Sequence, residues 1–317
     1  MADSDVVWDE IDKQLDITLS DTYEKPKLEG QEEEHFLDTS ESDTRKNLSA
    51  KHCYTFLTTT VEQKKCCTGN IVCLDDDRIV ISDFQWSQLN VFDKDYDFCF
   101  SKRCHPRAEI THYSGNEIAL TSRDLRKVLF YAVEKKRIVQ LPKILDVKYK
   151  TYGVKYGNKH FGLLMVSDML CYHILNDEGV EVGKIRTELG NNPLTPSKYY
   201  AMDPTEKKFY VSDQINSNIL IMSYTGETLY KQKVFVSTPC GIILLEKVIV
   251  VIIGNEYMWR LTPVHNYYTV QSFINKEDNV GQPVHMALQH RRKCIIVGSD
   301  KKNYSDVVKS FQVTWSE

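Results

Sequence analysis

The sequence predicts an all-β chain folded as a six-bladed β-propeller. An apolar strand ending in Ser-Asp, or in a variant of it, recurs six times, with its last residue at Asp83, Asp124, Asp168, Asp213, Asn255 and Asp300. These positions are 41 to 45 residues apart. A proline stands 16 to 18 residues before four of them, and no segment after residue 50 shows sustained helical periodicity. Short strands repeated at this interval are typical of propeller blades.

Each repeat unit is expected to contain four strands. The first strand lies innermost, a polar turn follows, and the second strand is the apolar run that ends at Asp. A loop, a third strand, a hairpin turn such as NDEG (176–179) and a fourth strand complete the unit. The segments expected to form the innermost strands are IVCL (71–74), EITHY (109–113), GVKY (153–156), YYAM (199–202), GIILL (241–245) and HMAL (285–288).

The ends of the repeat region predict how the ring closes. The last unit, residues 281–317, is short by about one strand, while the strand-like segment CYTFLTTT (53–60) precedes the first unit. We expect residues 53–60 to pair with the strand near residues 310–315 and to complete the last blade. Closure of this kind removes exposed strand edges. The propeller domain is therefore predicted to span residues 51–317.

Residues 1–50 form a different kind of segment. They contain 15 Asp or Glu residues and five Lys or Arg residues, with few apolar side chains, so this acidic leader is expected to be largely disordered. A short helix is predicted at 5–17, where Trp8, Ile11 and Leu15 fall on one face. That face fits a motif that binds a partner's groove, or a transient helix without a partner.

Composition limits the location of the chain. No apolar run approaches the roughly 18–20 residues that span a bilayer, and the N-terminus carries no signal-peptide pattern. The nine cysteines have no zinc-site spacing and are expected to be reduced and buried. We therefore expect a cytoplasmic protein with no membrane partner.

Two sets of residues carry a family resemblance. Pro239-Cys240-Gly241-Ile242 opens one unit, and Val211-Ser212-Asp213 followed by Asn216 closes another. These resemble the entry and exit of NHL repeats, as found in the C-terminal propellers of TRIM-NHL (tripartite motif) proteins, and most of all in the divergent invertebrate type. The resemblance covers residues 53–317, although Trp86 replaces the motif's Asn in the first unit. It implies a module that recognises substrates or partners of ubiquitin ligases. The sequence has no RING or B-box zinc pattern, so ubiquitin transfer by this chain is not expected.

A non-catalytic protein-interaction module is the expected function. Aromatic residues in loops are the expected anchors, because Trp and Tyr concentrate at interface hot spots, although Trp86 could equally pack between blades. The partner-binding candidates, aromatic and basic, are Phe84, Trp86, Arg107, Arg123, Arg126, Lys127, Lys301, Lys302 and Tyr304. The basic residues leave RNA binding open as an alternative, with Arg291–Lys293 expected on the opposite face. No DNA partner is expected.

An enzyme is the third hypothesis. Some six-bladed propellers resembling this one are metal-dependent hydrolases or lyases, which need carboxylates or His on the inner strands. Here those strands offer Glu109, His112 and His285, and both histidines are expected to line the channel or to be hydrogen-bonded in the core. No catalytic residue, metal site or cofactor is predicted. Asp83, which has counterparts in the other units, is expected to cap the loop that follows it.

Overall fold

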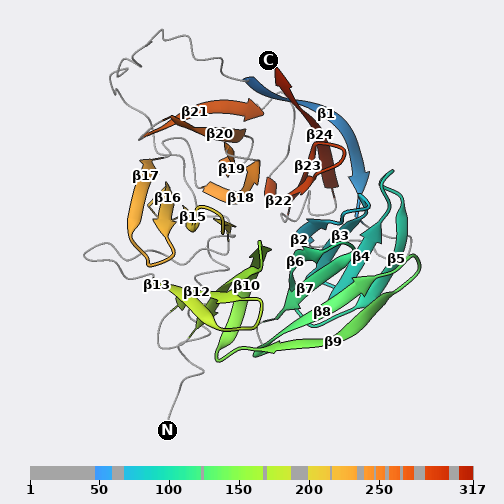
Figure 1. Ribbon diagram of the computed structural model, residues 1–317. Helices are drawn as coiled ribbons and strands as arrows, with labels where there is room; N and C mark the ends of the chain where they lie inside the picture. Colours follow the sequence, from blue (N-terminus) through green and yellow to red (C-terminus); the bar gives the residue numbers. More distant parts are fainter. Residues whose placement is uncertain are drawn as a thin grey trace. The chain divides into compact units, whose positions relative to one another are not determined.

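The computed structural model describes residues 47–58, 68–122, 125–166, 170–186, 199–214, 216–233, 239–245, 248–253, 257–264, 267–274, 283–299 and 307–316. The predicted helix at 5–17, with Trp8, Ile11 and Leu15, lies outside these residues, as does most of the acidic leader. The residues from Asn47 to Ser316 form one compact unit. The described residues contain only β-strands as regular structure, arranged in six antiparallel four-stranded sheets (Figure 1).

Five of the sheets are each made from four consecutive strands. The first contains β2 (Thr68–Cys73), β3 (Ile79–Asp83), β4 (Gln88–Phe92) and β5 (Phe98–Arg103). The second contains β6 (Glu109–Ser114), β7 (Glu117–Thr121), β8 (Lys127–Val133) and β9 (Ile138–Asp146). The third contains β10 (Lys150–Gly157), β11 (His160–Val166), β12 (Leu170–Asn176) and β13 (Glu181–Arg186). The fourth contains β14 (Tyr200–Asp203), β15 (Lys208–Asp213), β16 (Asn218–Ser223) and β17 (Thr228–Lys233). The fifth contains β18 (Pro239–Leu245), β19 (Val248–Ile253), β20 (Tyr257–Val264) and β21 (Tyr267–Ile274).

The sixth sheet is a composite of both ends of the propeller. Its order is β1 (Asn47–Leu57), β24 (Val307–Ser316), β23 (Cys294–Ser299) and β22 (Pro283–Gln289). β1 runs antiparallel to β24, with Leu57 opposite Val307 and Asn47 opposite Ser316. The closing segment therefore begins at Asn47, earlier than the 53–60 expected from the sequence, because the pairing with β24 continues past a bulge between His52 and Tyr54.

The blade count expected from the sequence is corrected here. A blade in the sense of the repeat is one continuous segment of four strands, and the chain has five of these, not six. The composite sheet takes the remaining place in the ring. β2 contacts β6 and β22, β10 contacts β6 and β14, and β18 contacts β14 and β22. The strands β2, β6, β10, β14, β18 and β22, one from each sheet, therefore surround one central axis (Figure 1).

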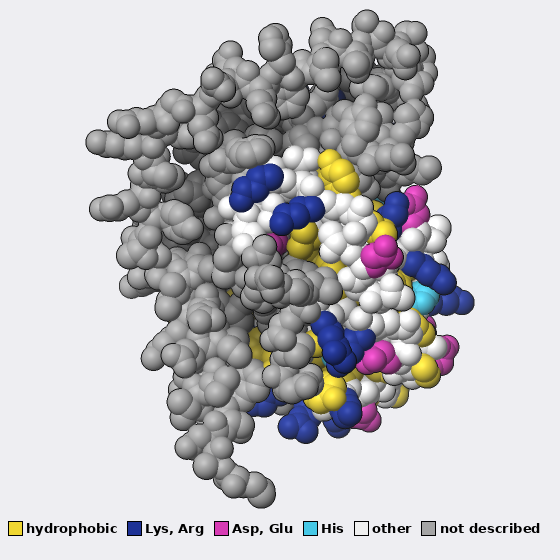
Figure 2. All heavy atoms as spheres, turned by 90° about the vertical axis from the view of Figure 1, so that its left-hand side faces the viewer, with side chains coloured by type: hydrophobic (Ala, Val, Ile, Leu, Met, Phe, Trp, Pro, Cys, Tyr) yellow, Lys and Arg dark blue, Asp and Glu magenta, His cyan; other side chains and the backbone are white. Residues whose placement is uncertain are grey.

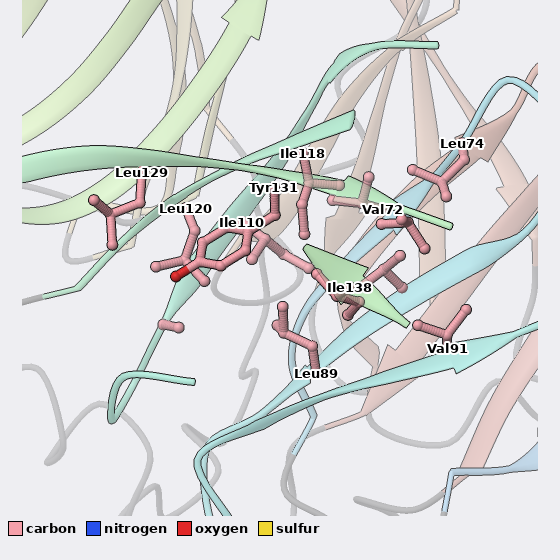
Figure 3. Packing of buried hydrophobic residues seen from close by; sticks show 13 residues of the cluster. Val72, Leu74, Leu89, Val91, Ile110, Ile118, Leu120, Leu129, Tyr131 and Ile138 are labelled. Carbon is pink, nitrogen blue, oxygen red and sulfur yellow. The ribbon is translucent and has the colours of Figure 1, made fainter. Parts of the chain in front are cut away.

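Apolar side chains fill the seams between neighbouring sheets. Figure 3 shows one seam, in which Val72 and Leu89 of the first sheet pack against Ile110 and Ile118 of the second. Another seam joins β1 to the first sheet, where Phe56 packs with Ile79, Ile81 and Phe92. The fourth strands differ, because one of their faces meets solvent: β5 alternates between exposed and half-buried residues near its C-terminal end. In the first and fourth sheets burial thus falls from the second strand to the fourth.

The acid at the end of the second strand has the expected capping role. The Asp83 side chain is buried, and its Oδ1 accepts hydrogen bonds from the backbone N–H groups of Gln85 (2.9 Å) and Trp86 (3.2 Å). Asp213 Oδ1 accepts a hydrogen bond from Asn216 N at 3.2 Å in the same way. The capping prediction is confirmed at these two positions. The four equivalent residues of the other units, Asp124, Asp168, Asn255 and Asp300, lie outside the described residues.

The cysteines are only partly as expected. Within the described residues all are free thiols. Cys73, Cys171 and Cys294 are buried, and burial raises the pKa of the Cys73 thiol. Cys53 and Cys99 are exposed, because each lies on a strand at the outer edge of the ring, so the expectation of buried thiols is wrong for these two. No helix in the described part of the chain is long and apolar enough to cross a membrane.

Candidate functional site

The loop between β3 and β4 presents an aromatic side chain to solvent. The two hydrogen bonds to Asp83 fix its backbone. Trp86 is 46% exposed, so it projects from the ring rather than packing between sheets. Phe84 is half-buried and lies over Gly69, where a Cβ atom would come within 2.1 Å of its ring. Phe84 therefore holds the loop against β2 and leaves Trp86 as the exposed aromatic group.

Hydrogen bonds tie this loop to its neighbours. Cys104 N donates to Ser87 O at 2.8 Å, which joins the β3–β4 loop to the connection that follows β5. Ser122 Oγ donates to Pro106 O at 2.7 Å, which joins that connection to the β7–β8 loop. We call this continuous surface the loop face; its residues are 84–87, 104–107, 122 and 125–127.

Positive side chains belong to the same loop face as Trp86. Arg107, Arg126 and Lys127 are all exposed. Lys127 lies 3.8 Å from Asp146 Oδ1, a solvent-exposed ion pair that contributes little stability. Of the predicted partner-binding residues, Phe84, Trp86 and these three cations therefore lie on the loop face. Arg123, Lys301, Lys302 and Tyr304 lie outside the described residues.

Cationic side chains are not confined to the loop face. Figure 2, which views the molecule from the side of β17, shows separate groups of Lys and Arg with acidic side chains between them. In the β22–β23 turn, Arg292 Nη2 pairs with Asp95 Oδ1 at 2.9 Å and its side chain also donates to Lys94 O. The Arg292 guanidinium is therefore bonded to residues of the β4–β5 turn, which lies at the other end of these strands from the loop face. The loop face therefore differs from the other cationic surfaces mainly by the exposed indole of Trp86, and less by its positive charge.

A pocket occupies the central axis of the ring. The empty space between its lining residues and in the adjoining solvent together is about 330 Å³, so the closed part of the pocket is much smaller. The innermost strand of every sheet contributes to its wall, with β22 as the innermost strand of the composite sheet. The lining residues are Asn70, Glu109, Lys155, Tyr199, Tyr200, Gly241, Ile242, His285 and Met286.

The polar groups of this pocket have distinct environments. Asn70 Nδ2 donates to Glu109 Oε2 at 3.0 Å and to Ile110 O at 3.1 Å, so the amide fixes the carboxylate in place. Tyr200 OH donates to Gly162 O at 2.8 Å. Lys155 makes no hydrogen bond or ion pair to the described residues, and loss of water around it lowers the pKa of its ammonium group, although the Glu109 charge acts in the opposite direction.

The sequence expectations for the inner strands are met in part. His285 is 6% exposed and lines the pocket, and Glu109 does too. His112 does not: its Nε2 lies 3.0 Å from Gly115 O and 3.4 Å from Asp75 Oδ1, at a turn. Asn70 and Lys155 were missed. A lysine inside the apolar inner segment GVKY was the available signal for Lys155, whereas Asn70 lies just before the segment expected to form its strand.

No group of three or more His, Cys, Asp or Glu side chains in the described part of the chain is arranged to hold a metal ion. The pocket has one carboxylate and one imidazole among its lining residues, together with an ammonium and two phenols. This donor set is suited to hydrogen bonding and ion pairing among these side chains and with water.

The comparisons with known proteins define the class of protein. No protein-family model matches the chain, and no curated protein sequence matches it. Among solved structures, the Myceliophteria thermophila Cps50 (Swd1) β-propeller domain is similar over 82% of this chain and 100% of its own, with 10% identity and a TM-score of 0.53.

Two further solved structures have comparable similarity. A chain of the mitotic checkpoint complex matches 92% of this chain and 98% of its own at 9% identity and a TM-score of 0.54. The pyrroloquinoline quinone (PQQ)-bound aldose sugar dehydrogenase of Streptomyces coelicolor matches 85% and 99% at 11% identity and a TM-score of 0.54. At these identities the likeness establishes the fold, a β-propeller, and leaves function open.

Proposed function

We propose that this β-propeller is a non-catalytic protein-interaction module that binds a partner through the loop face. The observation that carries the proposal is Trp86, which is 46% exposed on a loop whose backbone is fixed by the buried carboxylate of Asp83. An aromatic side chain on a loop whose backbone is already fixed requires less loss of backbone entropy on binding, which favours affinity. Solved propellers of similar fold include one in a checkpoint complex.

The charges of the loop face favour a partner with an acidic segment. Arg107 and Arg126 flank the surface, and exposed cations of this kind accelerate association and select orientation more than they add affinity. The NHL-like motifs fit a role in which the bound partner is a substrate presented to a separate ubiquitin ligase. That role is part of the proposal.

Affinity capture with matched variants tests the proposed function. Trp86→Ala should remove the specific partner, because hot-spot truncation costs about 2 kcal/mol or more, roughly 30-fold in affinity. Leu229→Ala is the matched control, since Leu229 is 47% exposed on the outer strand β17. Retention of the same partners by Trp86→Ala, or loss of all binding after RNase treatment with a steep salt dependence, would overturn the proposal and favour RNA.

A further inference from the structure

The central pocket is too small for an organic ligand and large enough for water. Its cavity volume is about 20 Å³, far below the roughly 300–1,000 Å³ of small-molecule sites. A cavity of roughly 10–15 Å³ is enough to hold one water molecule. The walls are the innermost strands of the six sheets, each of which has a neighbouring sheet on both sides. The pocket therefore suits one or two water molecules.

The carboxylate of Glu109 is held on one side of this pocket. Asn70 Nδ2 donates to Glu109 Oε2 at 3.0 Å and to Ile110 O at 3.1 Å. Asn70 is itself fixed, because its backbone N–H donates to Ser82 Oγ at 2.8 Å and its Oδ1 accepts from Ile71 N at 2.8 Å. The carboxylate therefore cannot move across the pocket without breaking this network.

Lys155 supplies a positive charge to the same pocket. Its side chain is half-buried, and it makes no hydrogen bond or ion pair to the described residues. Loss of water lowers the pKa of its ammonium group and the charge of Glu109 opposes this shift, so the two groups interact without direct contact. A partly dehydrated ammonium group is stabilised by a hydrogen-bond acceptor. A strong donor and a fixed carboxylate therefore line one space of water size.

The two charges restrict what this space can hold. A bound anion would be repelled by Glu109, and a bound cation would be repelled by Lys155. A water molecule is neutral, and it can accept a hydrogen bond from the ammonium group while it donates another to the carboxylate. Buried water molecules make roughly two to four hydrogen bonds, and the polar side chains of Tyr199 and His285 also line the pocket. Water therefore matches the volume, the charges and the polar groups of the site.

We propose that the pocket is a water-binding site in which one ordered water molecule bridges Lys155 and Glu109. The bridge joins β10 of the third sheet to β6 of the second, in addition to the apolar seam between these sheets. It also closes the axis at this level, because no room is left for an organic substrate between the two side chains. The water site is separate from the loop face, and its occupancy does not depend on the proposed partner.

A crystal structure of the full chain, with crystals grown in sodium bromide, tests the site. We expect an electron-density peak without the anomalous signal of bromide at about 2.6–3.2 Å from both Lys155 Nζ and a Glu109 carboxylate oxygen. An anomalous peak at that position would mean that an anion is bound, and a direct contact between the two side chains would mean that no water bridges them. Either result, or the absence of any peak, would overturn the proposal.

A double-mutant cycle tests the bridge in solution. Lys155→Met and Glu109→Gln should be coupled by about five-fold or more in the unfolding equilibrium constant, because each change leaves the other group with an incomplete network. Lys208→Met and Glu206→Gln form the matched control cycle: this ion pair, 2.6 Å long, lies at an exposed turn, so its coupling should be smaller. Additive effects at the axis would contradict the bridge. If Lys155→Met does not fold, the crystal structure alone decides.

Discussion

Asp83 and Asp213 illustrate at the scale of single residues how the loops of this ring are fixed. Each ends the second strand of its sheet and accepts backbone N–H groups of the following loop. In the first sheet the carboxylate is buried, so an apolar replacement would deprive both N–H groups of this acceptor. The exposure of Trp86 therefore depends on a side chain three positions earlier.

Replacement of Asp83 tests this dependence. We expect Asp83→Ala to lower the free energy of unfolding by about 1–3 kcal/mol, because two N–H groups lose a buried acceptor. Asp203→Ala is the control: Asp203 Oδ1 accepts from Thr205 N (2.9 Å) and Glu206 N (3.1 Å) at a more exposed turn, so its loss should cost less. Denaturant unfolding of both variants measures the difference, and equal losses would contradict it.

His173 gives stability a dependence on pH. It is 2% exposed, its Nδ1 lies 2.5 Å from Glu181 Oε2, and its Nε2 has no hydrogen-bond partner among the described residues. Burial lowers the pKa of His173 below its ordinary value of 6.5, although Glu181 opposes that shift. The unfolded chain therefore binds this proton more readily than the folded chain does, and stability falls as pH drops below about 6.5.

Substitution of His173 should remove that contribution. We expect the unfolding free energy of His173→Gln to change less between pH 7 and pH 5 than that of the wild-type protein, measured by urea unfolding at each pH. An identical pH dependence in the two proteins would show that the histidine is not responsible.

At the scale of elements, β1 closes the ring. It pairs with β24 along its whole length, and Phe56 packs into the seam with the first sheet. The rings of Tyr54 and Phe56 both stack on Tyr96 with centroids 5.0 Å apart. β1 thus supplies both backbone pairing to one sheet and apolar contact to the next.

Two truncations separate β1 from the leader. Removal of residues 1–46 should leave the melting temperature unchanged, because β1 is retained. Removal of residues 1–58 should lower the unfolding free energy by about 3 kcal/mol or more, since a buried Phe side chain and a full strand pairing are lost. Differential scanning calorimetry measures both, and similar melting temperatures for the two truncated proteins would contradict the role of β1.

The elements also reveal what the sequence could predict. All six inner segments predicted from the sequence fall in the innermost strands of their sheets, because apolar runs bounded by Pro, Gly and Asp carry strong local signals. The closing strand was placed too late, since its first residues, Asn47 to Lys51, contain only two apolar side chains, Leu48 and Ala50, and join the sheet through pairing with β24. Lys155 was missed as a pocket residue because convergence on an axis depends on the ring and not on its own segment.

At the scale of the whole molecule, every sheet shares apolar contacts with both neighbours. The third and fourth sheets meet through Tyr172, Tyr200 and Phe209, with ring centroids 4.9 to 5.1 Å apart. The Tyr200 hydroxyl also reaches across this seam to Gly162 O at 2.8 Å. A sheet that separated from the ring would expose two apolar faces at once.

We therefore expect the propeller to unfold as one cooperative unit. Phe56→Ala, in the composite sheet, should lower the unfolding midpoint by the same amount whether it is followed by tryptophan fluorescence, by far-ultraviolet circular dichroism or by hydrogen exchange in the opposite, third sheet. Separate transitions for different probes would mean that individual sheets unfold independently.

The composite sheet has a consequence for folding during synthesis on the ribosome. Ser49 and Thr314, whose side-chain oxygens lie 2.7 Å apart in the folded ring, are separated by 265 positions in the chain. At a synthesis rate of about 5–20 residues per second, β1 waits roughly 10–50 s for its partner strand. During that interval the backbone edge of β1 is unpaired and the side chain of Phe56 lacks its native packing partners. The nascent chain is therefore expected to need a chaperone until the last strand emerges.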